Sequence, residues 1–250
     1  MLNLNNITLT IIDGINPPDL CLKTLLYCSK DIKFHAIKLF SFAKPSTKLK
    51  NIEFIKINKL NLAQYNEFIL RELYKYIYSD FCLLVQTDGF IINPHLWNYD
   101  FLKYDYIGAP WPDDYDWINK QKPEQRHSII QNYQKGIGRV GNGGFSLRSK
   151  KLLNLSANAP FLINDLPEDN YICMHYIDYF LNLGITFAPP SLAADFSLEN
   201  PVKEKTFDLN TCFGFHGKHK HELKLEIDKM KFYNKKSILR KLKDKIFHIF

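Results

Sequence analysis

The stretch FCLLVQTDG at residues 81–89 decides the fold that we expect for this sequence. Its first part, from Phe81 to Val85, is an uninterrupted apolar run, which is typical of a strand buried on both faces. Gln86, Thr87 and Asp88 follow where that strand ends. Because ligands of open α/β sheets bind beyond the carboxyl ends of the strands, the stretch predicts a sheet with a functional edge.

Helices and strands alternate before this stretch. The elements expected from apolar spacing are strands at 7–12, 34–42 and 52–57, a helix introduced by Pro17-Pro18-Asp19, and a helix over 61–77. This alternation predicts a mainly parallel, doubly wound α/β sheet flanked by helices.

The pattern changes after residue 89. Residues 104–135 show few clear periods and predict a long surface loop, and loops of that length in a compact domain are commonly functional. Beyond it we expect a short helix at 150–155, a helix over 168–183 ended by Gly184, and a last strand at 186–188.

A glycine-rich segment, VGNGGFSLRSKK, covers residues 140–151. Because Gly141, Gly143 and Gly144 lack a Cβ, they let the backbone approach a bound group closely. Residues 136–141 also fit the pattern GxGxxG, but no strand leads into them and Asn142-Gly143-Gly144 stands where a helix should begin. A dinucleotide site is therefore rejected.

Two further acids, Glu168 and Asp169, stand at the start of the helix expected over 168–183. The helix dipole favours an ionised carboxylate there, which suits a general base. Acids in the first turn of a helix are also common as N-terminal stabilisers, and Asp88-Gly89 is also typical of a plain turn. One acid of the pair can cap the helix while the other faces a cleft.

Candidate ligands of a divalent cation occur at three places. Asp88 is the first, because hard cations bind carboxylate oxygens. Asp114-x-Asp116 matches a two-acid metal motif but lies in the polar loop. His216, within CFGFHGKHK, either joins a metal site or belongs to a His- and Lys-rich tail.

Cysteine use and hydropathy indicate the compartment. The five cysteines form no CxxC pair and are expected to be buried, reduced thiols. No basic leader precedes the first apolar run, and no apolar stretch is long enough to span a bilayer. We therefore expect a cytoplasmic protein, or one peripheral on the inner face of a membrane.

The basic charge belongs to the C-terminal tail. Residues 218–250 hold 11 Lys or Arg and 4 Asp or Glu, a balance equal to the net charge of +7 of the whole chain. Apolar residues recur there at helical spacing among the lysines, which predicts a basic amphipathic helix. Such a helix either lies on an anionic membrane surface or docks on the domain, and without a reading motif nucleic acid is the weaker partner. We therefore divide the chain into a domain at 1–217 and a tail at 218–250.

Taken in order, several motifs resemble a family of GT-A-fold, glycosyltransferase-like proteins. The matching stretches are Tyr65-Asn66, LLVQTDG at 83–89, YDYIGAPW at 104–111, VGNGGFSLRS at 140–149, PED at 167–169, FSLE at 196–199 and, more loosely, FGFHG at 213–217. The resemblance implies a GT-A fold of the nucleotide-diphospho-sugar transferase type. It also implies a glycosyltransferase that moves a sugar from a nucleotide-activated donor to a hydroxyl of a glycan or lipid-linked acceptor, as in the synthesis of cell-surface polysaccharide.

The chain is also similar to inverting β-1,3-type sugar transferases, and this similarity suggests roles for single residues. By that similarity Asp169 is the catalytic base beside Glu168, and Asp88 and His216 hold Mn²⁺ or Mg²⁺. Gln86 stands where those enzymes have a first acid, so the metal site is degenerate. The remaining expectations are donor binding by Asp13, Asn66, Gln86, Asp88 and Lys218, and acceptor binding by Gly143, Gly144 and the stacking face of Trp111.

Two other functions fit the same features. The first is a non-catalytic carbohydrate-binding protein that kept the fold after losing one metal acid. The second is a nucleotidyltransferase acting on sugar phosphates, but such enzymes favour a glycine-rich, basic loop near the N-terminus. The segment after Asp13 has no such loop.

Overall fold

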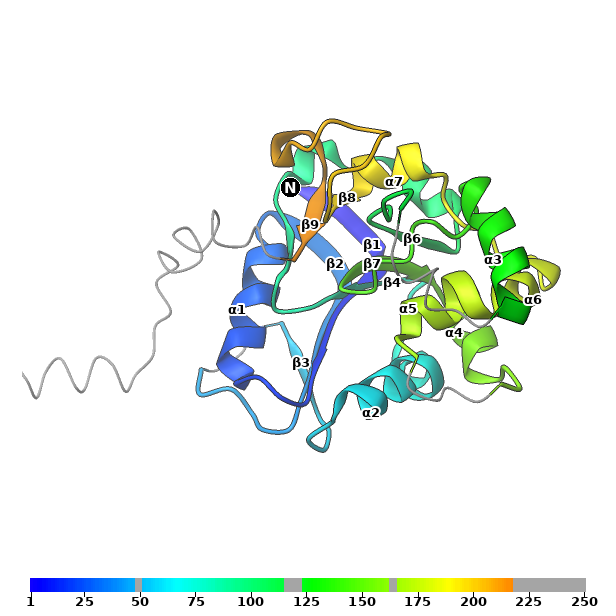
Figure 1. The fold of residues 1–250 in the computed structure, drawn as a ribbon. Coiled ribbons are helices and arrows are strands. Elements are labelled where there is room, and N and C mark those ends of the chain that lie inside the picture. Colours follow the sequence, from blue (N-terminus) through cyan, green and yellow to red (C-terminus); the bar gives the residue numbers. More distant parts are fainter. Residues whose placement is uncertain (48–50, 115–122, 162–165, 218–250) are drawn as a thin grey trace, which may run out of the picture.

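A six-stranded sheet in the order β3-β2-β1-β4-β7-β6 lies at the centre of the computed structural model, which describes residues 1–47, 51–114, 123–161 and 166–217 (Figure 1). Its strands are β1 (Leu2–Asp13), β2 (Ile32–Ser41), β3 (Glu53–Lys56), β4 (Phe81–Val85), β6 (Tyr106–Gly108) and β7 (Phe145–Ser149). Neighbours among β1 to β4 pair in parallel, whereas β7 pairs antiparallel with both β4 and β6. The predicted mixed, mainly parallel sheet is confirmed.

Helices cover both faces of this sheet (Figure 1). The α-helices are α1 (Pro18–Cys28), α2 (Leu62–Glu67), α3 (Pro123–Gln134), α4 (Lys150–Ala157), α5 (Glu168–Asn170), α6 (Ile177–Asn182) and α7 (Pro190–Phe196). Two π-helical turns, Phe68–Glu72 and Tyr171–His175, and four 3₁₀ turns, Leu73–Tyr76, Pro94–Leu96, Tyr99–Lys103 and Leu209–Thr211, complete the helical residues that the structure describes.

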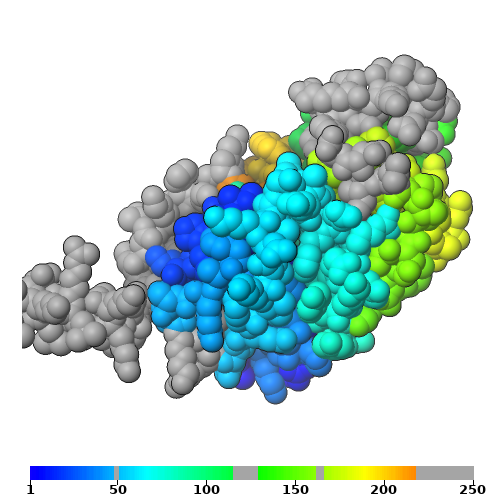
Figure 2. All heavy atoms as spheres, turned by 90° about the horizontal axis from the view of Figure 1, so that it is seen from below, coloured from blue at the N-terminus to red at the C-terminus, as the bar shows by residue number. Residues whose placement is uncertain are grey.

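Alternate residues of the central strands pack into different cores, because successive side chains of a strand point to opposite faces. One core joins Leu9, Ile11, Leu83 and Val85 to Cys21 and Leu25 of α1. The other joins Ile12, Cys82 and Leu84 to Ile69, Leu73 and Leu153. Figure 2 shows the second face from outside, where residues of the 62–77 segment (cyan) lie between the N-terminal residues (blue) and the yellow-green residues that follow β7.

Both long helices expected from the sequence are broken by a π-helical turn. The first begins in a capping box, in which Asn61 and Gln64 each accept a hydrogen bond from the other's backbone N–H. It changes to π-helix at Phe68, and the helix expected over 168–183 changes at Tyr171. π-helical turns are frequent at functional sites. Here they flank the edge of the sheet to which β4 leads.

Two sequence expectations were wrong. Residues 104–135 are not one surface loop, because they contain β6, whose Ile107 is fully buried, and α3. The last strand expected at 186–188 is a single bridge between Phe187 and Tyr106. β6 has only three residues, too few for the sequence pattern to distinguish a strand from a loop. Its pairing partner β7 also lies far along the chain.

A small second sheet holds residues that follow β4. Its strands are β5 (Gly89–Ile91), β9 (Gly214–His216) and β8 (Ser197–Leu198), in the order β5-β9-β8. Gly89 is the register partner of His216, and the N–H of Gly217 donates to the carbonyl of Asp88 over 3.0 Å. The pairing therefore places Asp88 beside His216, although they are far apart in the sequence.

Among the residues that the structure describes, no helix is both long enough and apolar enough to cross a membrane. The tail at 218–250, including Lys218 and the expected amphipathic helix, lies outside the described residues, as does Asp116. The predicted roles of these residues stay predictions.

Candidate functional site

Strand order brings the predicted site residues to one edge of the sheet. β1 and β4 are parallel neighbours, so Asp13 and Gln86 stand together at their carboxyl ends. Val85 pairs with Phe145, the first residue of the antiparallel β7, so the glycine-rich segment reaches the same edge. The N–H of Gln86 donates to the carbonyl of Gly144 over 2.9 Å.

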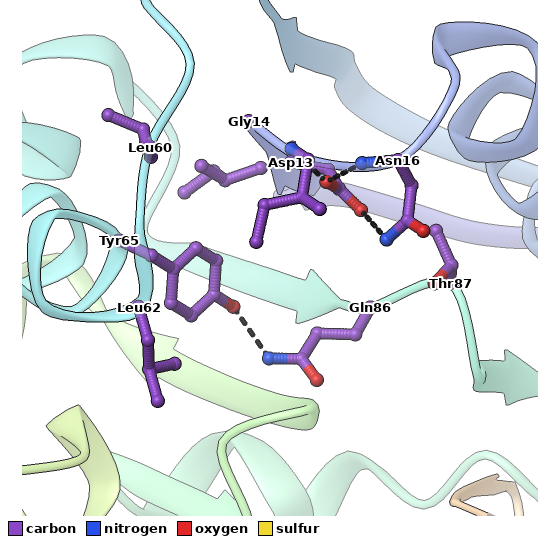
Figure 3. Close-up of a pocket in the computed structure, with 10 residues that line it drawn as sticks. Asp13, Gly14, Asn16, Leu60, Leu62, Tyr65, Gln86 and Thr87 are labelled. Carbon is purple, nitrogen blue, oxygen red and sulfur yellow. Dashed lines mark hydrogen bonds between the residues drawn. The ribbon is translucent and has the colours of Figure 1, made fainter.

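Two adjoining hollows open at this edge. The strand-end hollow, of about 170 Å³, lies between the turn after β1 and the start of α2, and its wall includes Asp13 and Leu60 (Figure 3). The acidic hollow, of about 180 Å³, is lined by Asp169 and His216 among others. Tyr65 and Gln86 line both hollows. Gln86 Nε2 donates to the Tyr65 hydroxyl over 2.8 Å, so this hydrogen-bonded pair forms the shared wall together with Leu62.

Asp169 stands in the acidic hollow at the start of α5. Its Oδ2 accepts the N–H of Gly143 over 3.0 Å, and its Oδ1 accepts the N–H of Asn170 over 2.7 Å. Burial, followed by the negative charge of Glu168, raises the pKa of Asp169 to about 7. The expectation that the helix start favours the ionised form was therefore wrong, because burial outweighs the dipole of a three-residue helix. A carboxyl with this pKa can accept a proton near neutral pH.

Glu168 differs from its neighbour in what it contacts. It is 3% exposed, and its Oε1 accepts a hydrogen bond from Nη2 of the fully buried Arg148 over 2.8 Å. Both side chains line the acidic hollow, but the carboxylate of Asp169 is held by backbone N–H groups, whereas Glu168 is paired with Arg148. A catalytic role for Glu168 stays a prediction.

The glycines make room for the protein's own side chains. A Cβ on Gly143 would overlap the carboxylate of Glu168, a Cβ on Gly144 would overlap the imidazole of His216, and one on Gly141 would overlap the indole of Trp111. Gly143 and Gly144 nevertheless line the acidic hollow, and their expected contact with an acceptor sugar stays a prediction.

Trp111 lies beneath the glycine-rich segment instead of presenting a ring to solvent. It is 2% exposed, because Gly141 allows the indole to pack against the backbone. Trp111 still lines the acidic hollow. An exposed stacking face was the wrong expectation, and Trp111 contributes a rigid wall.

His216 is surrounded by polar groups. Its Nε2 lies 3.3 Å from Asp88 Oδ1 and 3.3 Å from Gln86 Oε1, and its Nδ1 lies 3.2 Å from Glu199 Oε1. Burial alone lowers the pKa of His216, but the hydrogen bonds to Asp88 and Glu199 outweigh it and raise the pKa to about 9. Asp88 and Glu199 therefore favour the protonated form of the His216 ring.

The expected divalent-cation site draws on Asp88 and His216. A histidine ligand is neutral and offers a nitrogen lone pair. Nε2 of His216 faces the oxygens of Asp88 and Gln86, whereas its Nδ1 lies 3.2 Å from both Glu199 Oε1 and the amide nitrogen of Asn142. No three His, Cys, Asp or Glu side chains within the described ranges are grouped so that they could hold a metal ion. Binding of Mn²⁺ or Mg²⁺ by Asp88 and His216 stays a prediction.

The other predicted donor residues lie in different surroundings. Asp13 lines the strand-end hollow, but its carboxylate also accepts hydrogen bonds from the N–H groups of Ile15 and Asn16 and from Asn16 Nδ2, which shape the turn (Figure 3). Asn66 is 3% exposed and lines the acidic hollow together with Gly143, Gly144 and Trp111, the residues expected to bind the acceptor.

Sequence reasoning assigned no role to Glu199, Asn142 and Arg148. Glu199 was noted only as the end of the FSLE motif, and Asn142 only within the glycine-rich segment. Asn142 links the segment to the second sheet, because its side chain contacts His216 Nδ1 at 3.2 Å and accepts the N–H of Gly144 at 3.0 Å. The alternation of Ser146 and Arg148 along β7 is a signal that could have identified the arginine, since charged residues are seldom buried unless they are paired.

Solved sugar-transferase structures are among those to which this chain is similar. The galactosyltransferase LgtC, solved with donor and acceptor sugar analogues, is 14% identical over 84% of this chain and 86% of that one, with a TM-score of 0.45. An active-site mutant of LgtC has the same coverages and TM-score at 15% identity. The bifunctional IspDF from Campylobacter jejuni is 12% identical over 75% of this chain, with a TM-score of 0.41. The chain spans about half of IspDF, 49% of its length.

Comparison of the sequence itself gives a family and no individual relative. No curated protein matches the chain. A family model described as "Protein of unknown function (DUF5672)" matches residues 48–216. The matched range includes the residues that line both hollows, except those at the end of β1 and in the turn that follows it. The chain belongs to that family.

Proposed function

We propose that the protein is a glycosyltransferase that moves a sugar from a nucleotide-activated donor to a hydroxyl of a glycan or lipid-linked acceptor. The observation that carries this proposal is the position of Asp169, a carboxyl with a pKa of about 7, in a hollow that shares a wall with a second one. Two adjoining hollows suit a reaction between two substrates. The motifs that resemble GT-A glycosyltransferases lie in and around both.

The strand-end hollow suits the nucleotide part of the donor. It combines the apolar side chains of Ile12, Leu60 and Leu62 with the polar Asn16 and Gln86, a mixture typical of sites that bind a flat ring and fix its orientation. Ile15 and Leu62 are 69% and 67% exposed at this hollow, so apolar surface is available to a ligand there.

The chemistry proposed for the acidic hollow is a single displacement. The acceptor hydroxyl oxygen forms a bond to the anomeric carbon of the donor while Asp169 takes the hydroxyl proton. The bond from that carbon to the diphosphate breaks, and the nucleoside diphosphate leaves with its electrons. The imidazolium of His216 at the wall of the hollow supplies positive charge near a departing anion.

Screening nucleotide sugars tests this function. Thermal shift with a panel of donors identifies the nucleotide, and release of nucleoside diphosphate is then measured in Mn²⁺, in Mg²⁺ and in EDTA, so that activity and metal dependence are read separately. Release that requires an acceptor supports a glycosyltransferase. A thermal shift with sugars alone, without release from any donor, supports the carbohydrate-binding alternative.

The pKa of Asp169 predicts the pH dependence of turnover. Below pH 7 the carboxyl holds a proton and cannot accept another, so kcat is expected to fall with an acidic midpoint near the pKa of about 7. An aspartate with an ordinary pKa, about 3.9, would leave kcat unchanged over the same range. Initial rates from pH 5 to 9 at saturating donor check this.

The tail is proposed to bind an anionic membrane surface. It carries the excess positive charge of the chain, and its apolar residues recur at helical spacing. We expect the full chain to sediment with vesicles of phosphatidylserine and phosphatidylcholine and to be released by salt, because screening acts over about 10 Å at 0.1 M. A protein ending at residue 217 that sediments equally well would remove the tail from this role.

A further inference from the structure

Arg148 is fully buried beneath the acidic hollow and does not line it. It lies on β7 two residues after Ser146, so the two side chains share a face of the strand. Its guanidinium lies 5.2 Å from the ring centre of Tyr106 on β6. From this position Arg148 reaches Asp169 through two sets of contacts.

The first set runs through the backbone of the glycine-rich segment. Arg148 Nε donates to Ser146 Oγ over 3.0 Å, and Ser146 Oγ donates to the carbonyl of Gly143 over 3.2 Å. The N–H of the same Gly143 donates to Asp169 Oδ2 over 3.0 Å. Rotation of the backbone at Gly143 would therefore move the donor that holds the carboxylate.

The second set runs through Glu168. Arg148 Nη2 donates to Glu168 Oε1 over 2.8 Å, and Glu168 precedes Asp169 in the chain. The Glu168 carboxylate fills the space that a Cβ on Gly143 would take. Both sets of contacts thus end at Gly143 and Asp169.

Stability alone gives a poor reason for this pair. Buried ion pairs often contribute no more than apolar residues of the same volume, because removing two charges from water is costly. Arg148 Nη1 and Glu168 Oε2 are buried and have no hydrogen-bond partner among the described residues, which adds to that cost. An ion pair of this kind is more readily explained by what it positions.

We propose that Arg148 is a positioning residue of the acidic hollow, which fixes Gly143 and Glu168 and through them the carboxylate of Asp169. The inference rests on the proposed role of Asp169 as the base. It concerns how the base is held and not which sugar is transferred.

The charges around Asp169 determine the direction in which its pKa should change when Arg148 and Glu168 are replaced. Burial and then the charge of Glu168 raise the pKa of Asp169, and the smaller effect of Arg148 lowers it. Tyr106 and Cys173 also face it, and their own pKa values are raised by burial, so they are neutral there. His216 and Glu199 line the same hollow, and their side-chain contacts are with each other, Asp88, Gln86 and Asn142, not with Arg148. Removing Arg148 and Glu168 together should therefore lower the pKa of Asp169.

The test is the double variant Arg148→Met with Glu168→Met, in which no buried charge is left unpaired. We expect kcat to fall about 10²-fold with the donor KM unchanged, since a misplacement of about 1 Å costs that much. We also expect the Asp169 carboxyl, followed by NMR in ¹³C-aspartate-labelled full-length protein, to titrate at lower pH. The matched control is Lys38→Met with Glu53→Gln, which removes a buried cation and its partner at the far edge of the sheet. We expect this control to change neither kcat nor the pH at which Asp169 titrates.

A folded double variant with the kcat and the Asp169 titration of the wild type would overturn the proposal. Ser146→Ala removes one set of contacts without touching a charge, so it decides the matter if the double variant does not fold. We expect it to lower kcat about tenfold, the cost of about one hydrogen bond, and an unchanged kcat would overturn the proposal. If the wild type releases no nucleoside diphosphate from any donor, the proposed function fails. The NMR titration still decides in that case whether Arg148 and Glu168 set the pKa of the Asp169 carboxyl.

Discussion

Replacing Asp169 by Asn is expected to lower the rate of sugar transfer by about 10²- to 10⁴-fold, the usual contribution of a positioned general base. The amide is neutral and cannot take the proton of the acceptor hydroxyl. Because it has nearly the shape of the carboxylate, it can still accept the N–H of Gly143 through its one carbonyl oxygen. Release of nucleoside diphosphate under saturating donor and acceptor measures the loss.

Binding of the donor should survive this change, because Asp169 does not line the strand-end hollow. The thermal shift with nucleoside diphosphate is therefore expected to equal that of the wild type. Asp178→Asn is the matched control: Asp178 is exposed in α6, accepts a hydrogen bond from Asn132 Nδ2 over 2.9 Å, and lies outside both hollows. Full turnover by Asp169→Asn would remove this residue from the mechanism.

Replacing Gly143 by Ala is expected to reduce both turnover and stability. The φ angle of Gly143 is not in the left-handed region, so the added methyl acts through its overlap with the Glu168 carboxylate. Overpacking costs about 1–3 kcal/mol, and each kcal/mol lowers the Tm of a protein of this size by about 2–4 °C. A displaced Glu168 also carries Asp169 with it, and a displacement of about 1 Å costs about 10²-fold in rate.

Gly184→Ala separates these two effects. Gly184 has a φ of +73°, and the nearest atom to its Cβ would be Lys151 Nζ at 3.5 Å, so alanine there strains the backbone without touching the site. We expect Gly184→Ala to lower Tm while kcat per folded molecule stays at the wild-type value. A Gly143→Ala protein whose kcat is equally unaffected would show that the contact with Glu168 has no catalytic consequence.

Periodicity predicted the four parallel strands of the central sheet, β1 to β4, because they are long or bounded by clear turns. The strand predicted at 81–85 coincides with β4, and the strands predicted at 34–42 and 52–57 differ from β2 and β3 by one or two residues at their ends. β5, β6, β8 and β9 escaped prediction because each has three residues or fewer and pairs with a distant part of the chain. β7 was missed because its residues, Phe145–Ser149, were assigned to the glycine-rich segment. The register that brings His216 to Gly89 is set by tertiary packing.

Which residues gather at the site was easier to predict than what each of them does. Residue type and strand ends pointed to Asp88, Asp169 and His216, and the structure places His216 against Asp88 and in one hollow with Asp169. Their electrostatics could not be read from the sequence. Burial reverses the expected direction of the pKa shift at Asp169, and Glu199 joins Asp88 in raising the pKa of His216.

A crystal structure of the full chain with the nucleotide that gives the largest thermal shift tests the central claim most directly. The account predicts a nucleobase in the strand-end hollow, between Leu60 and the turn after Asp13, and a diphosphate directed past Gln86 toward the acidic hollow. Asp169 should then face the space beyond the diphosphate, where the acceptor hydroxyl would lie. A nucleotide bound at a different surface, with the acidic hollow out of its reach, would contradict the proposed transfer reaction.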